Sequence, residues 1–370
     1  MLCAVDRIAL VLRRSPPMSY AKKGAIPSAE GGKTGYLLIN LGTPDAPERA
    51  AVARYLREFL MDPRVIDLAW PLRAFLVHGI IAPFRSAKSA EAYAKIWTAA
   101  GSPLLLNTLA LGRKVATRLE PSPLAVAMRY QNPSIRAGLE QLLAAGVCRI
   151  VVCALFPQES EATTGSVRVE VGRRLKQLAP AVALEFTPPF FDEPGFIGCQ
   201  ARLMAAAIRD FSPDAVIASY HGLPERRLRQ ADSAGHCLVA ADCCGSLTAV
   251  NAGCYRAQCH ATTRALAAAL DLPAERIRTT FQSRLGRARW IEPYTDRVVD
   301  ELARAGTRRI LVVSPAFTAD CLETLEELCI RLRESFRAAG GEDLRVAPCV
   351  NAEEDFADAV AGYLRAPTER

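Results

Sequence analysis

Residues 141–152 have the sequence QLLAAGVCRIVV, and residues 301–312 have the similar sequence ELARAGTRRILV. Each stretch contains the end of a helical segment, a glycine that stops the helix, and an apolar run typical of a buried strand. A second matching pair, LGTP at 41–44 and HGLP at 221–224, places a turn ending in proline after an apolar run. The repeat predicts two halves of related topology within one chain.

On both sides of these stretches, short apolar and β-branched runs alternate with amphipathic segments of helical length. The expected strands are 36–41, 124–129, 149–155, 181–186, 215–220, 277–281, 310–314 and 344–350. The clearest expected helices are 47–60, 133–145, 166–178, 295–305 and 322–339. Near-continuous apolar strands that alternate with helices are typical of parallel sheets covered on both faces. The predicted fold class is therefore α/β, with two Rossmann-like doubly wound parallel-sheet domains.

The two domains are expected at 35–187 and 188–350, with a cleft between them where ligands bind beyond the strand ends. The final segment, 351–370, is expected to form a helix that packs back on the first domain. Residues 1–34 are interpreted as a disordered arm or an over-extended start, with Met18 as the true initiator. A basic organelle presequence is the alternative, because the segment does not fit a secretory signal.

Composition limits the kinds of partner. The net charge of +7 is spread along 370 residues, which suits an acidic small molecule or an anionic membrane surface better than nucleic acid. No run of 18 apolar residues lacks charges and prolines, so no transmembrane helix is expected. Nothing signals an oxidising compartment, and a cytoplasmic location is predicted.

His221 is one of four histidines and follows an expected buried strand, where a parallel sheet opens its cleft. Histidine side chains accept and release protons near neutral pH. The acidic residues of 320–327 follow a second strand end, and Glu323 is expected to face the same cleft. A histidine and a carboxylate across a cleft can transfer protons or bind a divalent cation, although a structural histidine and helix-dipole pairing of the acids remain alternatives.

Five cysteines are crowded into a short stretch, at Cys237, Cys243, Cys244, Cys254 and Cys259. Structural zinc sites usually contain two short Cys-x2–4-Cys pairs, which this spacing lacks. Iron–sulfur clusters require four thiolates and tolerate varied spacing. A metal centre is predicted here, with an iron–sulfur cluster favoured over zinc.

Cations border the longest apolar stretch, 68–84. Arg85 and Lys88 follow it directly, and Tyr93 and Trp97 come a turn or two later. An apolar lip with cations at its rim would suit a flat apolar ligand that carries carboxylates. A solvated helix face is the alternative.

Taken together, six groups of motifs resemble those of the ferrochelatase family, in the same order, from about residue 36 to the end. They are LINLGTP at 38–44, FLMDPRVID at 59–67, FPQ at 156–158 with TTG at 163–165, VIASYHGLP at 216–224, FQSR at 281–284 with Trp290 and PYTD at 293–296, and AFTADCLETL at 316–325. The resemblance implies two Rossmann-like domains and an enzyme that inserts Fe²⁺ into protoporphyrin IX to give protohaem, the last step of haem biosynthesis.

The resemblance also implies roles for individual residues. His221 corresponds to the histidine that accepts the pyrrole protons, and Glu323, with Asp320 nearby, to the carboxylate that assists metal or proton traffic, so that His221 and Glu323 would contact the substrate iron. The implied substrate-binding positions are Leu41, Arg85, Lys88, Tyr93, Ser102, Arg129, Tyr130, Phe156 and Trp290. Of these, Arg85, Lys88 and Ser102 correspond to positions that hold propionates. The stretch 72–84 resembles the lip that lets some members sit on a membrane, which implies peripheral contact with the inner membrane.

The chain departs from the family in two places. Cys321 stands where many members have histidine. Animal members hold a [2Fe–2S] cluster with one ligand in the first domain, where this chain has Glu161, and three in a C-terminal extension, so the animal arrangement is not expected. The insertion 230–259 resembles the internal cluster site of some bacterial members instead. It implies a [2Fe–2S] cofactor on Cys237, Cys243, Cys244 and Cys254, with Cys259 as the substitute.

Two rival functions remain open at this point. One is a chelatase for another tetrapyrrole, such as coproporphyrin. The other is a non-enzymatic haem-binding iron–sulfur sensor on the same fold. The presence of both His221 and Glu323 argues against the sensor, because a pure binder does not need the pair. The oligomeric state is left open by the sequence.

Overall fold

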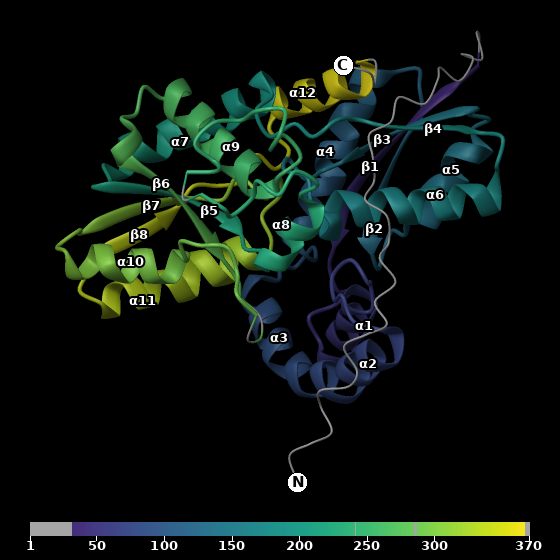
Figure 1. Cartoon of the computed structure of the whole chain (residues 1–370). Coiled ribbons are helices and arrows are strands. Elements are labelled where there is room, and N and C mark those ends of the chain that lie inside the picture. Colours follow the sequence, from purple (N-terminus) through teal and green to yellow (C-terminus); the bar gives the residue numbers. More distant parts are fainter. Residues whose placement is uncertain (1–31, 241, 285, 287, 367–370) are drawn as a thin grey trace.

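Two parallel four-stranded sheets form the framework of the chain (Figure 1). The computed structural model describes residues 32–240, 242–284, 286 and 288–366. Residues 1–31 of the predicted N-terminal arm lie outside the described residues. Both sheets have helices on both faces, which confirms the predicted α/β class.

The first sheet has the strand order β2-β1-β3-β4. Its strands are β1 (Thr34–Gly42), β2 (Leu124–Tyr130), β3 (Arg149–Ala154) and β4 (Ala183–Phe186). Alternate residues face opposite sides, as the period of a strand requires. Leu37 and Ile39 pack against α5 (Ile135–Ala144) and α6 (Ser166–Leu178), whereas Leu38 packs with α4 (Pro103–Leu119).

The second sheet repeats this order as β6-β5-β7-β8. Its strands are β5 (Ala215–His221), β6 (Ile277–Gln282), β7 (Arg309–Val313) and β8 (Asp343–Val346). One face is covered by α10 (Thr295–Arg304), the π-helix η4 (Glu323–Leu332) and α11 (Arg333–Ala338). The other face packs with α7 (Pro194–Phe211) and α9 (Tyr255–Ala269). The matching strand orders confirm the repeat that the sequence predicts.

Two expected elements differ in detail. The strand expected at 344–350 ends at Val346, and the chain continues to residue 350 without strand pairing. The helix expected at 322–339 is divided, because Glu323–Leu332 form a π-helix and Arg333–Ala338 an α-helix. A π-helix carries one extra residue per turn, so it changes which side chains share a face.

One apolar core crosses from one sheet to the other. It joins Leu38 of β1, Val216 of β5 and Phe356 of the last helix, α12 (Glu354–Arg365), all of which are buried. Figure 1 shows α12 lying beside α4 and α7. Lys114 of α4 pairs with Glu354 at 2.7 Å, so the C-terminal helix contacts the half of the chain that contains the first sheet.

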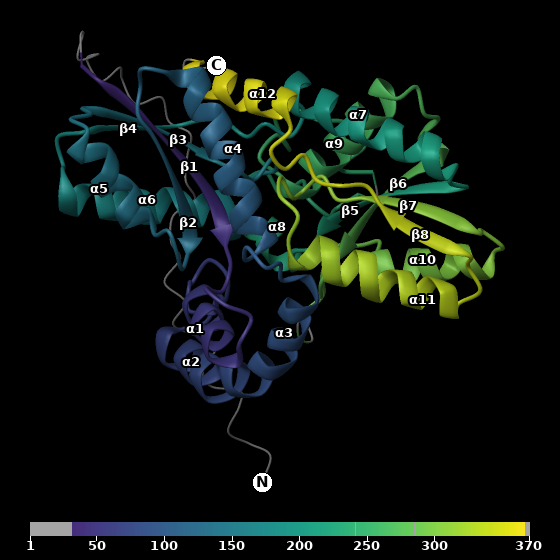
Figure 2. The ribbon, with the colours of Figure 1, turned by 180° about the vertical axis from the view of Figure 1, so that it is seen from behind.

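Further helices lie beyond the carboxyl ends of the first sheet. They are α1 (Arg49–Leu60), α2 (Trp70–Ala74), the π-helix η1 (Phe75–Ile81) and α3 (Ala82–Ile96). Figure 2 shows β1 pointing toward this group. The remaining short helices are η2 (Glu161–Gly165, a π-helix), α8 (Glu225–Ala231) and η3 (Ala274–Arg276, a 3₁₀-helix). Among the described helices, none has the length and apolar character needed to span a bilayer.

Candidate active site

His221 is the last residue of β5, and the peptide that follows it holds the ring in place. Its Nδ1 lies 2.7 Å from the carbonyl oxygen of Gly222. A carbonyl oxygen only accepts, so Nδ1 carries the hydrogen and Nε2 is the nitrogen that can accept a proton. The imidazole lies 6.5 Å from the Trp290 ring, centroid to centroid. The side chain therefore presents a basic nitrogen next to an aromatic surface.

Glu323 and Glu327 lie near His221, on the first turns of η4. Burial raises the pKa of the Glu327 carboxyl, while the hydrogen bond from Ser283 and the charge of His221 lower it and the charge of Glu323 raises it. The Ser283 hydroxyl donates to Glu327 at 2.6 Å. The two carboxyls and the imidazole thus form one electrostatic group. Glu327 was not among the residues predicted from the sequence, because helix-dipole pairing was sufficient to explain an acidic residue there.

Asp320 has a different environment from Glu323. Its Oδ2 accepts from the Asn351 amide at 2.7 Å, and its Oδ1 accepts from the Thr324 hydroxyl at 3.2 Å. Its own backbone N–H donates to the Asn351 side chain at 2.8 Å. These contacts fix the chain before η4, so both carboxylate oxygens of Asp320 already have structural partners.

Tyr93 of α3 brings the first half of the chain to this group. Burial raises its pKa far above the usual range, and the charges of Glu323 and Cys321 add to the shift. Its hydroxyl is hydrogen-bonded to Tyr55 and to Thr43, which follows β1. Lys95 of α3 also pairs with Glu326 of η4 at 3.6 Å. The loop after β1, α3 and η4 therefore meet at one place.

Four other predicted substrate-binding residues fall into two sets. Leu41 and Ser102 lie beside Thr43, and the Ser102 hydroxyl donates to the Thr43 hydroxyl at 2.9 Å. Arg129 and Tyr130 both bond Asp62 Oδ2, at 2.7 Å and 3.0 Å. Tyr130 is fully buried. The first set adjoins Thr43, a hydrogen-bond partner of Tyr93, whereas the polar atoms of the second set are used in a buried cluster with Asp62.

Arg85 and Lys88 are exposed on α3, at the end of an apolar surface. We call this surface the lip. Its exposed residues are Trp70, Leu72, Phe75, Ile80 and Phe84, with relative exposures of 66%, 54%, 66%, 43% and 78%. The apolar lip with cations at its rim, one of the two alternatives for this stretch, is therefore present as a surface.

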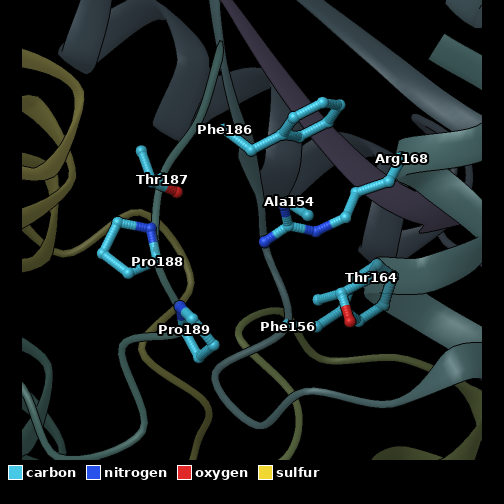
Figure 3. A pocket seen from close by; sticks show the side chains of 8 residues that line it. All are labelled: Ala154, Phe156, Thr164, Arg168, Phe186, Thr187, Pro188 and Pro189. Carbon is cyan, nitrogen blue, oxygen red and sulfur yellow. The ribbon is translucent and has the colours of Figure 1, made fainter. Parts of the chain in front are cut away.

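A small hollow lies where β3 and β4 end (Figure 3). Its lining residues are Ala154, Phe156, Thr164, Arg168, Phe186, Thr187, Pro188 and Pro189. The Arg168 guanidinium lies 5.0 Å from the centre of the Phe186 ring, which gives this cation an aromatic partner. Phe156 is the one predicted substrate-binding residue that lines the hollow, and neither His221 nor Glu323 does.

The cysteine segment, 232–254, connects α8 to α9. Cys237, Cys243, Cys244 and Cys254 are all buried, with exposures of 5–8%. The Sγ atoms of Cys243 and Cys244 are 3.8 Å apart. Hydrogen bonding from Cys244 lowers the pKa of Cys254 to about 6 against the effect of burial, helped by backbone N–H groups at the start of α9. Cys254 also bonds Cys237, so the four thiols form one chain of contacts.

Cys259 lies inside α9, is fully buried, and has Tyr255 as its hydrogen-bond partner. In the part of the chain that the structure describes, no group of three or more His, Cys, Asp or Glu side chains could hold a metal ion. The predicted [2Fe–2S] cofactor is therefore not confirmed. The donors around the thiols do suit an anionic group: the Leu238 N–H donates to Cys243 Sγ at 3.4 Å, and the buried Nε of Arg256 has no hydrogen-bond partner.

Comparison with known proteins gives a consistent result. The model of the ferrochelatase family matches residues 33–367. A ferrochelatase of Azotobacter vinelandii is 46% identical over 333 residues, which cover 90% of this chain and 98% of the relative. A ferrochelatase of Opitutus terrae is 44% identical over 334 residues, covering 89% and 96%. The solved structure of SirB from Bacillus subtilis with Fe3+ has a TM-score of 0.51 at 12% identity, covering 90% of this chain and 94% of that chain, which is a likeness of fold alone.

Proposed function

The chain belongs to the ferrochelatase family and is an enzyme that inserts Fe²⁺ into a porphyrin, and we propose that the porphyrin is protoporphyrin IX and the product protohaem. The lip supports this choice. Protoporphyrin IX has an apolar edge and two propionates, which match an apolar surface with two exposed cations, Arg85 and Lys88. Coproporphyrin carries four carboxylates, and two of them would remain beside apolar side chains.

Metal insertion breaks two pyrrole N–H bonds and forms four Fe–N bonds, with no change in oxidation state. His221 accepts the pyrrole protons one at a time at Nε2, because Nδ1 is already committed to Gly222, and it must release the first proton before it accepts the second. Trp290 offers a ring beside the imidazole on which the macrocycle can stack. The contact between β5 and the Trp290 loop carries the proposal, since it places a proton acceptor next to a surface for a flat ligand.

Glu323 supplies a carboxylate for the incoming iron or for a departing proton. Fe²⁺ loses its water ligands one at a time as it bonds to the pyrrole nitrogens, and an oxygen ligand stabilises the partly dehydrated ion. The charges of Glu327 and Glu323 interact, and burial raises the pKa of Glu327, which makes it a stronger proton acceptor than an ordinary carboxylate. Asp320 holds the start of η4 through Asn351, so that Glu323 keeps its position.

The direct test is an anaerobic spectrum of the purified protein before and after addition of Fe²⁺ and porphyrin. With protoporphyrin IX, the free-porphyrin bands are expected to give way to metalloporphyrin bands. Coproporphyrin III in the same assay gives the comparison of kcat/KM. Faster turnover of coproporphyrin would overturn the substrate assignment, and haem binding without turnover would favour the sensor.

We also propose that Cys237, Cys243, Cys244 and Cys254 hold a [2Fe–2S] cluster, with Cys259 as a substitute ligand. Support comes from the buried chain of thiols, the lowered pKa of Cys254, and Nη1 of Arg256, which lies 3.8 Å from Cys243 Sγ and 3.9 Å from Cys244 Sγ. When bound, a cluster supplies reversible one-electron chemistry and ties the turns of the segment together. No step of metal insertion involves it.

Iron, acid-labile sulfide and zinc analysis of protein purified without oxygen tests the cluster. Thiolate-to-iron absorption with equal iron and sulfide is expected, and Cys244→Ser should remove it. Zinc without sulfide would identify a zinc site instead. If Cys244→Ser keeps the full spectrum and Cys259→Ser loses it, then Cys259, not Cys244, is the fourth ligand.

For the lip we propose peripheral contact with the inner membrane, from a cytoplasmic location. The eleven described cysteines are free thiols, which agrees with a reducing compartment. The exposed apolar side chains lie beside Arg85 and Lys88, a combination that binds anionic lipid surfaces. Flotation with anionic and with neutral vesicles tests it. Phe75→Ser and Phe84→Ser together should reduce binding, and equal recovery of both proteins would contradict it.

A further inference from the structure

The two residues that follow Cys254 connect the cysteine segment to both loops that carry the active-site rings. The Tyr255 hydroxyl donates to the backbone carbonyl oxygen of His221 at 2.8 Å. Arg256 Nη2 donates to the carbonyl oxygen of Glu292 at 3.4 Å, two residues after Trp290. Both residues open α9, so the first turn of this helix is fixed to both loops.

The bond from Tyr255 acts on the peptide that orients the imidazole. The His221–Gly222 peptide accepts from Tyr255 at its oxygen and donates through its N–H to the Gln282 carbonyl at 2.7 Å. The next carbonyl, that of Gly222, bonds Nδ1 of His221. A peptide held at both its oxygen and its nitrogen cannot rotate freely, and the direction of Nε2 depends on it. Loss of the Tyr255 hydroxyl would leave the oxygen of the His221–Gly222 peptide without this hydrogen bond, so that the peptide could rotate more freely.

Arg256 extends the same connection to the thiols. Its Nη1 lies 3.8 Å from Cys243 Sγ and 3.9 Å from Cys244 Sγ. One guanidinium therefore contacts two cysteines on one side and the Trp290 loop on the other. Negative charge at the sulfur atoms would strengthen the first contact and draw the guanidinium toward the segment.

We propose that Tyr255 and Arg256 are positioning residues for metal insertion, which make the geometry of His221 and Trp290 depend on the state of the four cysteines. Tyr255 fixes the proton acceptor, and Arg256 fixes the loop on which the porphyrin stacks. The dependence on the cysteines rests on the proposed cluster, whereas the positioning of His221 does not. The two parts therefore have separate tests.

Tyr255→Phe removes one hydroxyl and tests the first part. We expect kcat for Fe²⁺ insertion to fall about threefold to tenfold, the range for one hydrogen bond, with the porphyrin KM changed less than about twofold. The visible spectrum and the iron content should stay as in the wild type. Tyr363→Phe is the control, because its hydroxyl also bonds a backbone group, the Phe196 N–H at 3.1 Å, in another part of the core. A wild-type kcat in Tyr255→Phe overturns the positioning role, whatever the iron content.

A double-mutant cycle with Cys244→Ser tests the dependence on the cysteines. If Tyr255 transmits their state, Cys244→Ser lowers kcat, and adding Tyr255→Phe lowers it no further. If each substitution instead lowers kcat by its own factor and the two factors multiply in the double variant, the coupling is overturned. Tyr255 then remains a positioning residue. Absence of iron and sulfide in the wild type would instead contradict the proposed cluster, and the cycle would then report on the free thiols.

Arg256→Gln tests the link to the Trp290 loop through binding. Quenching of tryptophan fluorescence by protoporphyrin IX should give a Kd raised about threefold to tenfold. Arg264→Gln is the matched control, since Arg264 bonds the Cys244 carbonyl at 3.0 Å in the same segment. Equal Kd values in the two variants, or no change in either, would overturn the role of Arg256.

Discussion

The two halves of the molecule share a strand order but carry different side chains at equivalent positions. Leu41 and His221 occupy the same place in the matching turns LGTP and HGLP. Glu161 and Glu323 each begin a π-helix after the third strand of their sheet. Glu161 pairs with Arg64 at 3.3 Å, whereas no salt bridge within the described residues involves Glu323. The scaffold is duplicated, and the two groups to which we assign the chemistry, His221 and Glu323, lie in the second half.

The insertions differ in the same way. Between the first strand and its crossover helix, the first half places α1 to α3 and the second half places α8 and the cysteine segment. Both insertions reach one site, through Tyr93 on one side and Tyr255 on the other. One insertion carries the exposed apolar lip, and the other carries the thiols and one hydrogen bond to each of the loops of His221 and Trp290.

If the second half carries out proton transfer, His221→Ala should lower kcat more than any other substitution that we propose. Loss of a general base is expected to lower kcat about 10²-fold to 10⁴-fold, with porphyrin Kd nearly unchanged. His78→Ala is the control, because His78 is exposed in the insertion of the first half. Near-wild-type kcat of His221→Ala at saturating Fe²⁺ would mean that another group accepts the protons.

The paired glutamates allow a sharper test. Glu323→Gln keeps the shape and removes the charge, and we expect kcat to fall about 10-fold to 100-fold because a ligand or proton carrier is lost. Glu161→Gln, at the equivalent position, should stay within about twofold, since exposed ion pairs contribute little. Steady-state assays at several Fe²⁺ concentrations separate kcat from KM. Equal losses in both variants would show that the halves are not functionally distinct.

The strand pattern could be predicted because buried strands are short apolar runs that stand out from their neighbours. The position of His221 could be predicted for the same reason, since it directly follows such a run. Glu327 could not, because acidic residues in the first turns of a helix are sufficiently explained by the helix dipole, and its partner Ser283 is 44 residues away in the sequence. Tyr255 and Arg256 were missed because their partners, His221 and Glu292, are 34 and 36 residues away in the sequence and have no pattern in common with them.

Binding of the propionates should depend on the first half. Arg85→Ala and Lys88→Ala are each expected to raise the porphyrin KM about threefold to tenfold, with kcat little changed, because an exposed cation contributes modestly. Lys176→Ala, an exposed lysine on α6, is the control. Porphyrin methyl esters lack the charge, so the two variants and the wild type should bind them equally. A larger effect on kcat than on KM would contradict the division between the halves.

The smallest expected effect concerns acid stability in the first half. Burial alone would raise the pKa of Asp62, but hydrogen bonds from Ser166 and the Arg64 N–H, with the charge of Arg129, outweigh it and lower the pKa below the usual range. A folded-state pKa below the unfolded value gives stability that is present above the unfolded pKa. This stability is lost as pH falls through the folded-state pKa.

If the cluster of Asp62 with Arg129 and Tyr130 is a scaffold, Asp62→Asn should lower the free energy of unfolding at pH 7. The gap to the wild type should then shrink by about 1 kcal/mol below pH ~4. Urea unfolding at pH 7 and in acid measures the gap, and a constant gap would show that the Asp62 charge does not stabilise the first half.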